Sequence, residues 1–209
     1  ITCYESKADV ADSIEISVIN ILKGKTDSES RVLYGFPTDQ NLYQNDVTDI
    51  IYPALHKYGP SEWRAAVLTN ELHGHLGIYA TIGVKMGIRA REFFNIGVDD
   101  INVTSFAGSN PPISCMNDGL QVSTGGTVGH GLFNISNHPI IRPEAIFKFK
   151  NKTVRMRLKK EYSDIIIEDV KKGVQMFGDS EDYWNYVRKL ALKYWLQFDR
   201  HNIFEIYNN

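Results

Sequence analysis

Apolar spacing, helix caps and terminal glycines predict helices in several stretches of the chain. Within the stretch expected over residues 78–94, Gly83 and Gly87 lie four positions apart on one face, so another backbone is expected to approach closely there. Ser180 is a good N-cap residue, and the two acidic residues that follow it suit the first turn of a helix. The predicted helices cover residues 46–59, 61–68, 78–94, 114–124, 161–172 (ending at Gly173) and 180–198.

Alternating apolar and polar positions predict strands between these helices. The last two strands form a hairpin around Asn151-Lys152, with Phe147, Phe149 and Val154 directed inward and lysines and arginines outward. Ile14 to Val18 fits a strand or a helix, and both are left open. The pattern indicates an α+β fold with a mixed or antiparallel sheet and packed helices. The predicted strands cover residues 31–36, 101–106, 132–135, 145–149 and 153–158.

Composition excludes several classes of protein. The 209 residues are 43% hydrophobic and 23% charged with a formal net charge of −2, which does not fit a disordered chain, collagen or a strongly basic nucleic-acid-binding protein. No apolar run is long enough to span a membrane. The first residue is Ile1 rather than Met, which favours an exported, processed protein, although a trimmed chain explains it equally.

The most informative local feature is His73-Gly74-His75. In a helix two histidines at this spacing would diverge by about 200°. An extended or glycine-distorted backbone would instead allow both imidazoles to approach one ion. The alternative is structural, with one histidine bonded in the core and the other at the surface. The pair is therefore a candidate metal-binding element whose convergence depends on the local backbone.

Cys115 follows Pro111-Pro112 at a predicted helix start, where a lowered thiol pKa is expected. With His73 and His75 it would supply three ligands, and a catalytic zinc site holds its metal by three protein ligands and an open position. A buried, unreactive cysteine is the alternative. Cys3 could pair with Cys115 or carry a lipid.

A glycine-rich turn runs from Gly125 to Gly131. It lacks the features of a phosphate loop or a dinucleotide fingerprint. We interpret it as a turn lining a pocket through Gly126 and Gly129, with His130 as an additional ligand or an acid/base group. A solvent-exposed His130 is the alternative.

Seven cations without an acid lie between Lys148 and Lys160, and alternation places those of the hairpin on its outer face. A solvated face is favoured over a polyanion site. The aromatic side chains of the last helix belong mostly to the core, and some are expected to face a second subunit.

Together these motifs resemble the FmdE-like proteins, a family named after a component of formylmethanofuran dehydrogenase. The resemblance rests on the sequence from Leu72 to Gly77, the glycine-spaced helix after it, Ser114-Cys115, and residues 124–131. It implies an α+β, often dimeric protein with metal bound near the histidine and cysteine motifs. His73, His75 and Cys115 match the family's motif residues. The resemblance divides the chain into an N-terminal extension (1–62), an FmdE-like metal-binding core (63–173) and a C-terminal helical extension (174–209).

The departures from the family pattern change the expected chemistry. Gly77 stands where the family has a cysteine, Gly126 replaces a second cysteine, and His130 replaces a lysine. The cysteine-rich zinc module of many members is missing from this sequence. A histidine-rich site is therefore expected rather than redox chemistry through paired thiols.

Three functional hypotheses follow. The first is a metal-binding protein, a homodimer, that holds a divalent ion at His73, His75 and Cys115; zinc is favoured, and nickel, iron or copper also suit these ligands. An open coordination position would support hydrolase or lyase chemistry on an unidentified small molecule. The second is a non-catalytic cofactor carrier or subunit-interaction protein. A weaker third hypothesis is a Cys115 nucleophile activated by His75 or His130.

Overall fold

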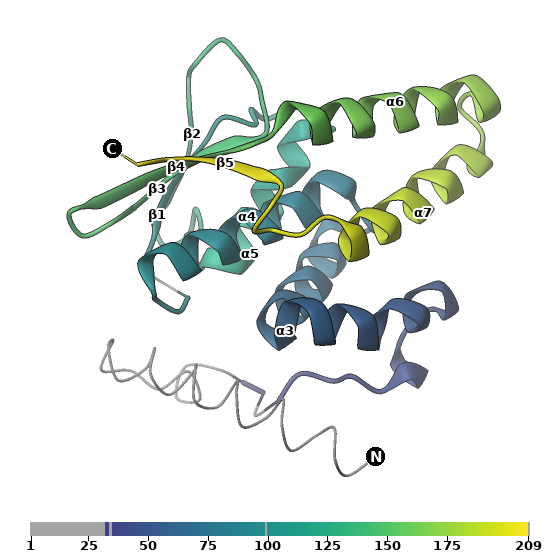
Figure 1. Ribbon diagram of the computed structural model, residues 1–209, viewed down its shortest axis with the longest axis horizontal. Coiled ribbons are helices and arrows are strands. Elements are labelled where there is room, and N and C mark those ends of the chain that lie inside the picture. Colours follow the sequence, from purple (N-terminus) through teal and green to yellow (C-terminus); the bar gives the residue numbers. More distant parts are fainter. Residues whose placement is uncertain (1–31, 34, 99, 209) are drawn as a thin grey trace.

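The computed structural model describes residues 32–33, 35–98 and 100–208, so Ile14 to Val18 and Cys3 lie outside the described residues (Figure 1). In the described part, helices and a sheet gather at opposite sides of the molecule. None of the described helices has the length and apolarity needed to cross a membrane. In chain order the elements are η1 (Gln40–Leu42), α3 (Asn45–His73), α4 (Ile78–Phe94), β1 (Asn102–Ser105), η2 (Ile113–Cys115), α5 (Met116–Thr124), β2 (Phe133–Ile135), β3 (Glu144–Phe149), β4 (Lys152–Leu158), α6 (Lys160–Phe177), α7 (Glu181–Gln197) and β5 (Phe204–Asn208).

The strands form a five-stranded sheet in the order β2-β1-β3-β4-β5. β1 pairs with β2 in parallel, and the other pairs are antiparallel. Phe147 of β3 pairs with Val154 of β4, and both are fully buried. The sheet is therefore mixed, the fold is α+β as predicted, and the hairpin has the expected inward-facing apolar residues.

α4 lies at the centre of the helical layer. It has the predicted bounds, and Ile82, Val84 and Met86 are almost completely buried. A Cβ at Gly83 would lie 2.1 Å from the Met116 carbonyl oxygen, and one at Gly119 would lie 2.1 Å from that of Ala80. α4 and α5 thus approach each other through glycines, as the spacing of Gly83 and Gly87 predicted.

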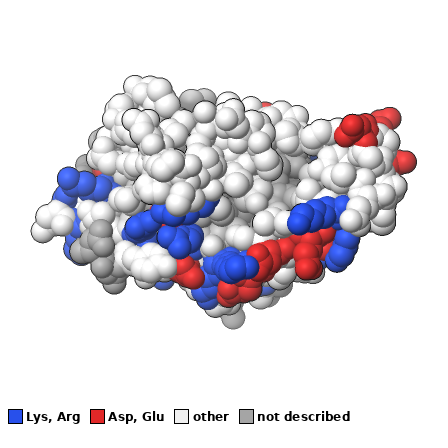
Figure 2. All heavy atoms as spheres, turned by 90° about the horizontal axis from the view of Figure 1, so that it is seen from above, with Lys and Arg blue, Asp and Glu red and all other residues white. Residues whose placement is uncertain are grey.

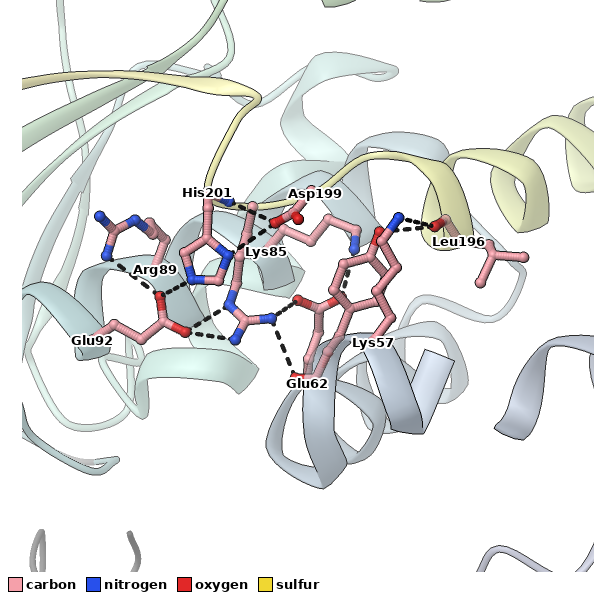
Figure 3. A network of polar contacts seen from close by, with 10 residues as sticks. Lys57, Glu62, Lys85, Arg89, Glu92, Leu196, Asp199 and His201 are labelled. Atoms are coloured by element: carbon pink, nitrogen blue, oxygen red, sulfur yellow. Dashed lines mark hydrogen bonds and ion pairs between the residues drawn. The ribbon is translucent and has the colours of Figure 1, made fainter. Parts of the chain in front are cut away.

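A buried network of charges joins α3, α4 and the segment after α7 (Figure 3). The fully buried side chains of Glu62 and Lys85 form an ion pair with 2.5 Å between Lys85 Nζ and Glu62 Oε1. Arg200 donates to the other oxygen of Glu62 at 3.0 Å and also to Glu92. His201 lies between Glu92 and Asp199, at 3.2 and 2.9 Å. The chain after α7 is therefore fastened to the helical layer by paired charges.

α3 bends at Gly59, which has φ +80° and ψ 166°, so the two helices predicted on either side of this glycine are continuous apart from a kink. α6 does not end at Gly173 as predicted but continues to Phe177. Gly173 is buried, and a Cβ there would lie 2.6 Å from the Tyr186 ring, so this glycine allows α7 to pack closely. Gly173 therefore serves the packing of α6 against α7 and does not mark the end of a helix.

Two strand assignments differ from expectation. The described residues of the segment 31–36 form no strand. The C-terminal segment is not helical throughout, because Phe204–Asn208 pairs with β4 as strand β5. β5 is short, and its pairing with β4 is a tertiary contact that local patterning does not reveal.

Candidate metal centre

The loop between α3 and α4 carries the histidine pair. α3 ends at His73, and Gly74 caps it in the left-handed conformation with φ +80°. The side chain of Asn70 spans the loop: its Nδ2 donates to the Ala66 carbonyl and its Oδ1 accepts from the Gly77 amide, both at 2.8 Å. Because Asn70 is buried, these bonds fix the loop relative to both helices.

His73 points toward α5. Its Nδ1 lies 2.7 Å from Oδ2 of Asp118, and its side chain is 11% exposed. The other ring nitrogen, Nε2, is buried and has no hydrogen-bond partner among the described residues. A Cβ at Gly77 would lie 3.2 Å from Nε2, so the ring edge packs over this glycine. An unpaired buried imidazole nitrogen is costly unless it binds something that the protein atoms do not supply.

His75 lies beside His73 at the surface, with 4.4 Å between the ring centroids. The helix cap at Gly74 turns the chain, so the two rings come together although His73 is helical. Partial burial of the ring and the neighbouring His73 lower the pKa of His75 below 6.5. His75 therefore favours the neutral form, which is the form that binds metal. Trp184 of α7 lies 6.3 Å away, ring centroid to ring centroid.

Cys115 is half-buried in the turn that precedes α5. Burial, and then the charge of Asp118, raise the pKa of its thiol. The expected lowering of the thiol pKa at a helix start is therefore wrong, because desolvation and a nearby carboxylate outweigh the helix N-terminus. This lowers the thiolate fraction and weakens the case for Cys115 as an unassisted nucleophile.

The glycine-rich turn lies after α5. His130 is exposed, and its Nδ1 is 2.9 Å from the Gly125 carbonyl oxygen. Gly126 is buried against β1, where a Cβ would lie 2.5 Å from the Ile101 carbonyl oxygen. Gly129 is exposed, and a Cβ there would meet only Thr127 Oγ1 within 4 Å, at 3.8 Å. A side chain at position 126 would therefore clash with the chain at the start of β1, which explains why a glycine occupies this position.

Within the described ranges, no group of three or more His, Cys, Asp or Glu side chains is arranged to hold a metal ion. What the structure brings together is the His73–His75 ring pair and the His73–Asp118 contact, with Cys115 three residues before Asp118. Asp118 was not among the predicted site residues. The sequence did offer one sign of it: Asp118 lies three residues after Cys115, and residues three apart share a helix face.

The residues nevertheless fit a metal. A metal-binding histidine commonly donates its second ring N–H to a carboxylate, which fixes the tautomer and directs the other nitrogen at the ion. Asp118 occupies that position at His73 Nδ1, and the unpartnered Nε2 is the nitrogen that would bind. Imidazole and thiolate are ligands that zinc accepts.

Comparison with known proteins supports the resemblance. The sequence model of the family described as "FmdE, Molybdenum formylmethanofuran dehydrogenase operon" matches residues 72–204, a range that includes His73, His75, Cys115 and His130. A protein of Archaeoglobus fulgidus named "Probable S-adenosyl-L-methionine-binding protein" is 26% identical over 134 residues. That alignment covers 62% of this chain and 31% of the relative, so the chain spans less than a third of the relative's length.

Proposed function

Because the chain belongs to the FmdE family, we propose that it binds a divalent metal ion through His73, His75 and Cys115. The observation that carries this proposal is the buried, unpartnered Nε2 of His73, whose partner nitrogen is held by Asp118. The lowered pKa of His75 keeps a second imidazole nitrogen available. His130 is a further candidate ligand or acid/base group.

Zinc is the favoured ion, and nickel, iron or copper are compatible with two imidazoles and one thiol. Cys115 binds as the thiolate, so its raised pKa in the metal-free protein means that binding releases a proton. A bound divalent ion with an open position would supply Lewis acidity and an activated water to a hydrolytic or lyase reaction. In either reaction, Asp118 holds the His73 ring in one orientation.

The proposal is tested by elemental analysis of protein purified without chelator. We expect the double variant His73→Ala/His75→Ala to lose the metal that the wild-type protein retains. His138→Ala is the matched control, since His138 is also exposed but belongs to a different loop. Equal metal content in the wild type and the double variant would contradict the proposal.

Cobalt substitution tests the role of Cys115 separately. A cobalt–thiolate ligand produces a charge-transfer absorption band, which Cys115→Ser should remove and the control His138→Ala should keep. If the band is absent from the wild-type protein although cobalt binds, Cys115 is not a ligand and only the histidine part of the proposal stands.

A second candidate function is a cofactor carrier or subunit-interaction protein, and Trp184 favours it. This indole is 59% exposed although it contacts the His75 ring, so a planar or cationic molecule could stack on it. The name of the Archaeoglobus relative suggests S-adenosyl-L-methionine as the probe. Titration should quench tryptophan fluorescence, and Trp184→Phe should abolish the change because Trp63 and Trp195 are buried.

A homodimer would also cover Trp184, together with the exposed Leu72 beside the histidine pair. Light scattering of the native protein distinguishes a dimer contact at Trp184 from the binding of a small molecule there. A dimer that Trp184→Glu dissociates supports a subunit contact. A monomer whose fluorescence does not respond to the probe contradicts this second candidate function in both forms.

A further inference from the structure

Three arginines converge on one carboxylate at the outer face of the sheet. Glu144, at the start of β3, has a fully buried side chain. It accepts hydrogen bonds from Arg142 Nη2 at 3.1 Å, from Arg155 Nε at 2.7 Å and from Arg157 Nε. Both carboxylate oxygens are therefore occupied by guanidinium donors.

The cluster carries excess positive charge. Lys148 lies on the same face of β3, two pleats from Glu144, and Glu205 of β5 lies opposite Arg157. Three guanidiniums thus face two carboxylates, and the ammonium of Lys148 lies farther along the same face of the strand. Figure 2 shows the same imbalance at larger scale: Lys and Arg predominate over the sheet end of this face, whereas acidic and basic side chains alternate along α6.

The guanidinium groups are also held in place. Arg142 and Arg155 lie over the Phe106 ring, 5.5 and 5.6 Å from its centroid, and Arg157 lies over Tyr207 at 5.8 Å. Their side chains are only 22–34% exposed. Each guanidinium has five N–H donors, and Glu144 takes only some of them. Ordered donors at the edge of solvent need little reorganisation to receive an anion.

We propose that Arg142, Arg155 and Arg157 bind the phosphate monoester group of a small ligand. The excess positive charge attracts a phosphate dianion, and the phosphate oxygens accept from several guanidinium forks at once. The basic run of the sequence favoured a solvated face, but convergence on a buried carboxylate sets Arg155 and Arg157 apart from the exposed lysines of that run. Glu144 holds the three arginines together when no ligand is bound.

The test is isothermal titration calorimetry of the protein as purified with inorganic pyrophosphate, at ionic strength held constant with chloride. We expect saturable binding that Arg155→Gln and Arg157→Gln each weaken at least about tenfold. Lys171→Gln, which removes one exposed charge from α6, is the matched control and should bind as the wild type does. Arg155→Lys keeps the charge and loses the fork, so an intermediate affinity is expected even if a glutamine variant does not fold.

Absence of saturable binding, or equal weakening by Lys171→Gln, overturns the proposal. The His73→Ala/His75→Ala variant should bind pyrophosphate normally, and loss of binding in that variant would assign the phosphate to the metal centre instead. Co-sedimentation with vesicles containing phosphatidic acid, abolished by Arg157→Gln, would identify a lipid headgroup as the source. Pyrophosphate binding without co-sedimentation assigns the site to the phosphate group of a soluble ligand rather than to a lipid headgroup.

Discussion

At the scale of single residues, the two nitrogens of His73 have different surroundings. Nδ1 is held by Asp118, and Nε2 is buried without a partner among the described residues. The Gly74 cap and the Asn70 bridge set the position of His75 beside it. A short loop, two helix ends and one carboxylate therefore define the orientation of the proposed ligands.

Asp118→Asn tests this orientation. The amide removes the negative charge that strengthens the His73 imidazole as a ligand, so we expect metal affinity to fall about ten- to hundredfold. Competition against a chromophoric chelator measures the change. The melting temperature of the metal-free protein should change little, because Asp118 is partly exposed, and an unchanged metal affinity would exclude the role proposed for its carboxylate.

Sequence motifs identified the histidine pair, because residue type and spacing are visible without a structure. They did not identify Asp118 as the partner of His73, since that contact joins two helices separated by more than 40 residues. The direction of the Cys115 pKa shift was also predicted wrongly. Burial of the thiol depends on the packing of the turn before α5, which the local sequence does not encode.

At the scale of elements, periodicity predicted α4 and the β3–β4 hairpin because each carries an apolar face in its own sequence, whereas the loop before α5 and the glycines after it marked that helix. Gly173 and β5 show the limit of this information. A glycine in a helix can serve close packing as well as termination, and a five-residue edge strand is defined by its partner. The role of Gly173 and the formation of β5 both depend on contacts with another element, which the local sequence does not show.

Gly83→Ala tests the close contact between α4 and α5. The added methyl would overlap the Met116 carbonyl oxygen, which is backbone and cannot move alone, so we expect a loss of about 1–3 kcal/mol or more in the free energy of unfolding. Thermal or urea denaturation measures it. Gly129→Ala is the control, with open space around its Cβ, and should be near neutral. Equal stabilities for the two variants would contradict the packing.

At the scale of the whole molecule, the buried Glu62–Lys85 pair and Arg200 connect the helical layer to the segment that leads into β5 (Figure 3). Burial lowers the pKa of Lys85 and the charge of Glu62 opposes this, so each charge depends on its partner. Such pairs add little net stability but are costly to break.

Lys85→Met should therefore destabilise the protein by about 3–5 kcal/mol, since among the described residues Glu62 would keep Arg200 alone as a hydrogen-bonded side-chain partner. The double variant Glu62→Gln/Lys85→Met removes both charges of the pair, and we expect it to recover part of the loss. Urea denaturation of these two variants and of the single variant Glu62→Gln measures the coupling between the two charges. Purely additive effects would show that the two charges do not depend on each other.

Stability at acid pH should depend on Glu144. Burial alone would raise the pKa of this carboxyl, but hydrogen bonds from Arg157, Arg142 and Arg155 outweigh it and hold the pKa below 4.5. A lowered carboxyl pKa contributes stability that is present above the unfolded value of 4.5 and is lost as the pH falls through the folded value.

We therefore expect the melting temperatures of wild type and Glu144→Gln to differ most near neutral pH and to approach each other below about pH 4. The Glu144→Gln variant keeps some acid sensitivity from Asp46 and Asp169, whose pKa values are lowered by Arg188 and by Lys193. Melting curves from pH 3 to pH 7 measure the difference, at roughly half-unit steps. A constant difference across that range would exclude the titration of Glu144.

The glycine contacts between α4 and α5 limit how the proposed metal ligands can move. α5 carries Cys115 and Asp118 at its start and cannot slide along α4 without separating two backbones in direct contact. His75 lies on a surface loop behind a single glycine cap. The Asn70 bonds hold the backbone of that loop as the glycines hold α5, so an arriving ion would be bound by rotation of side chains rather than by movement of one helix toward the other.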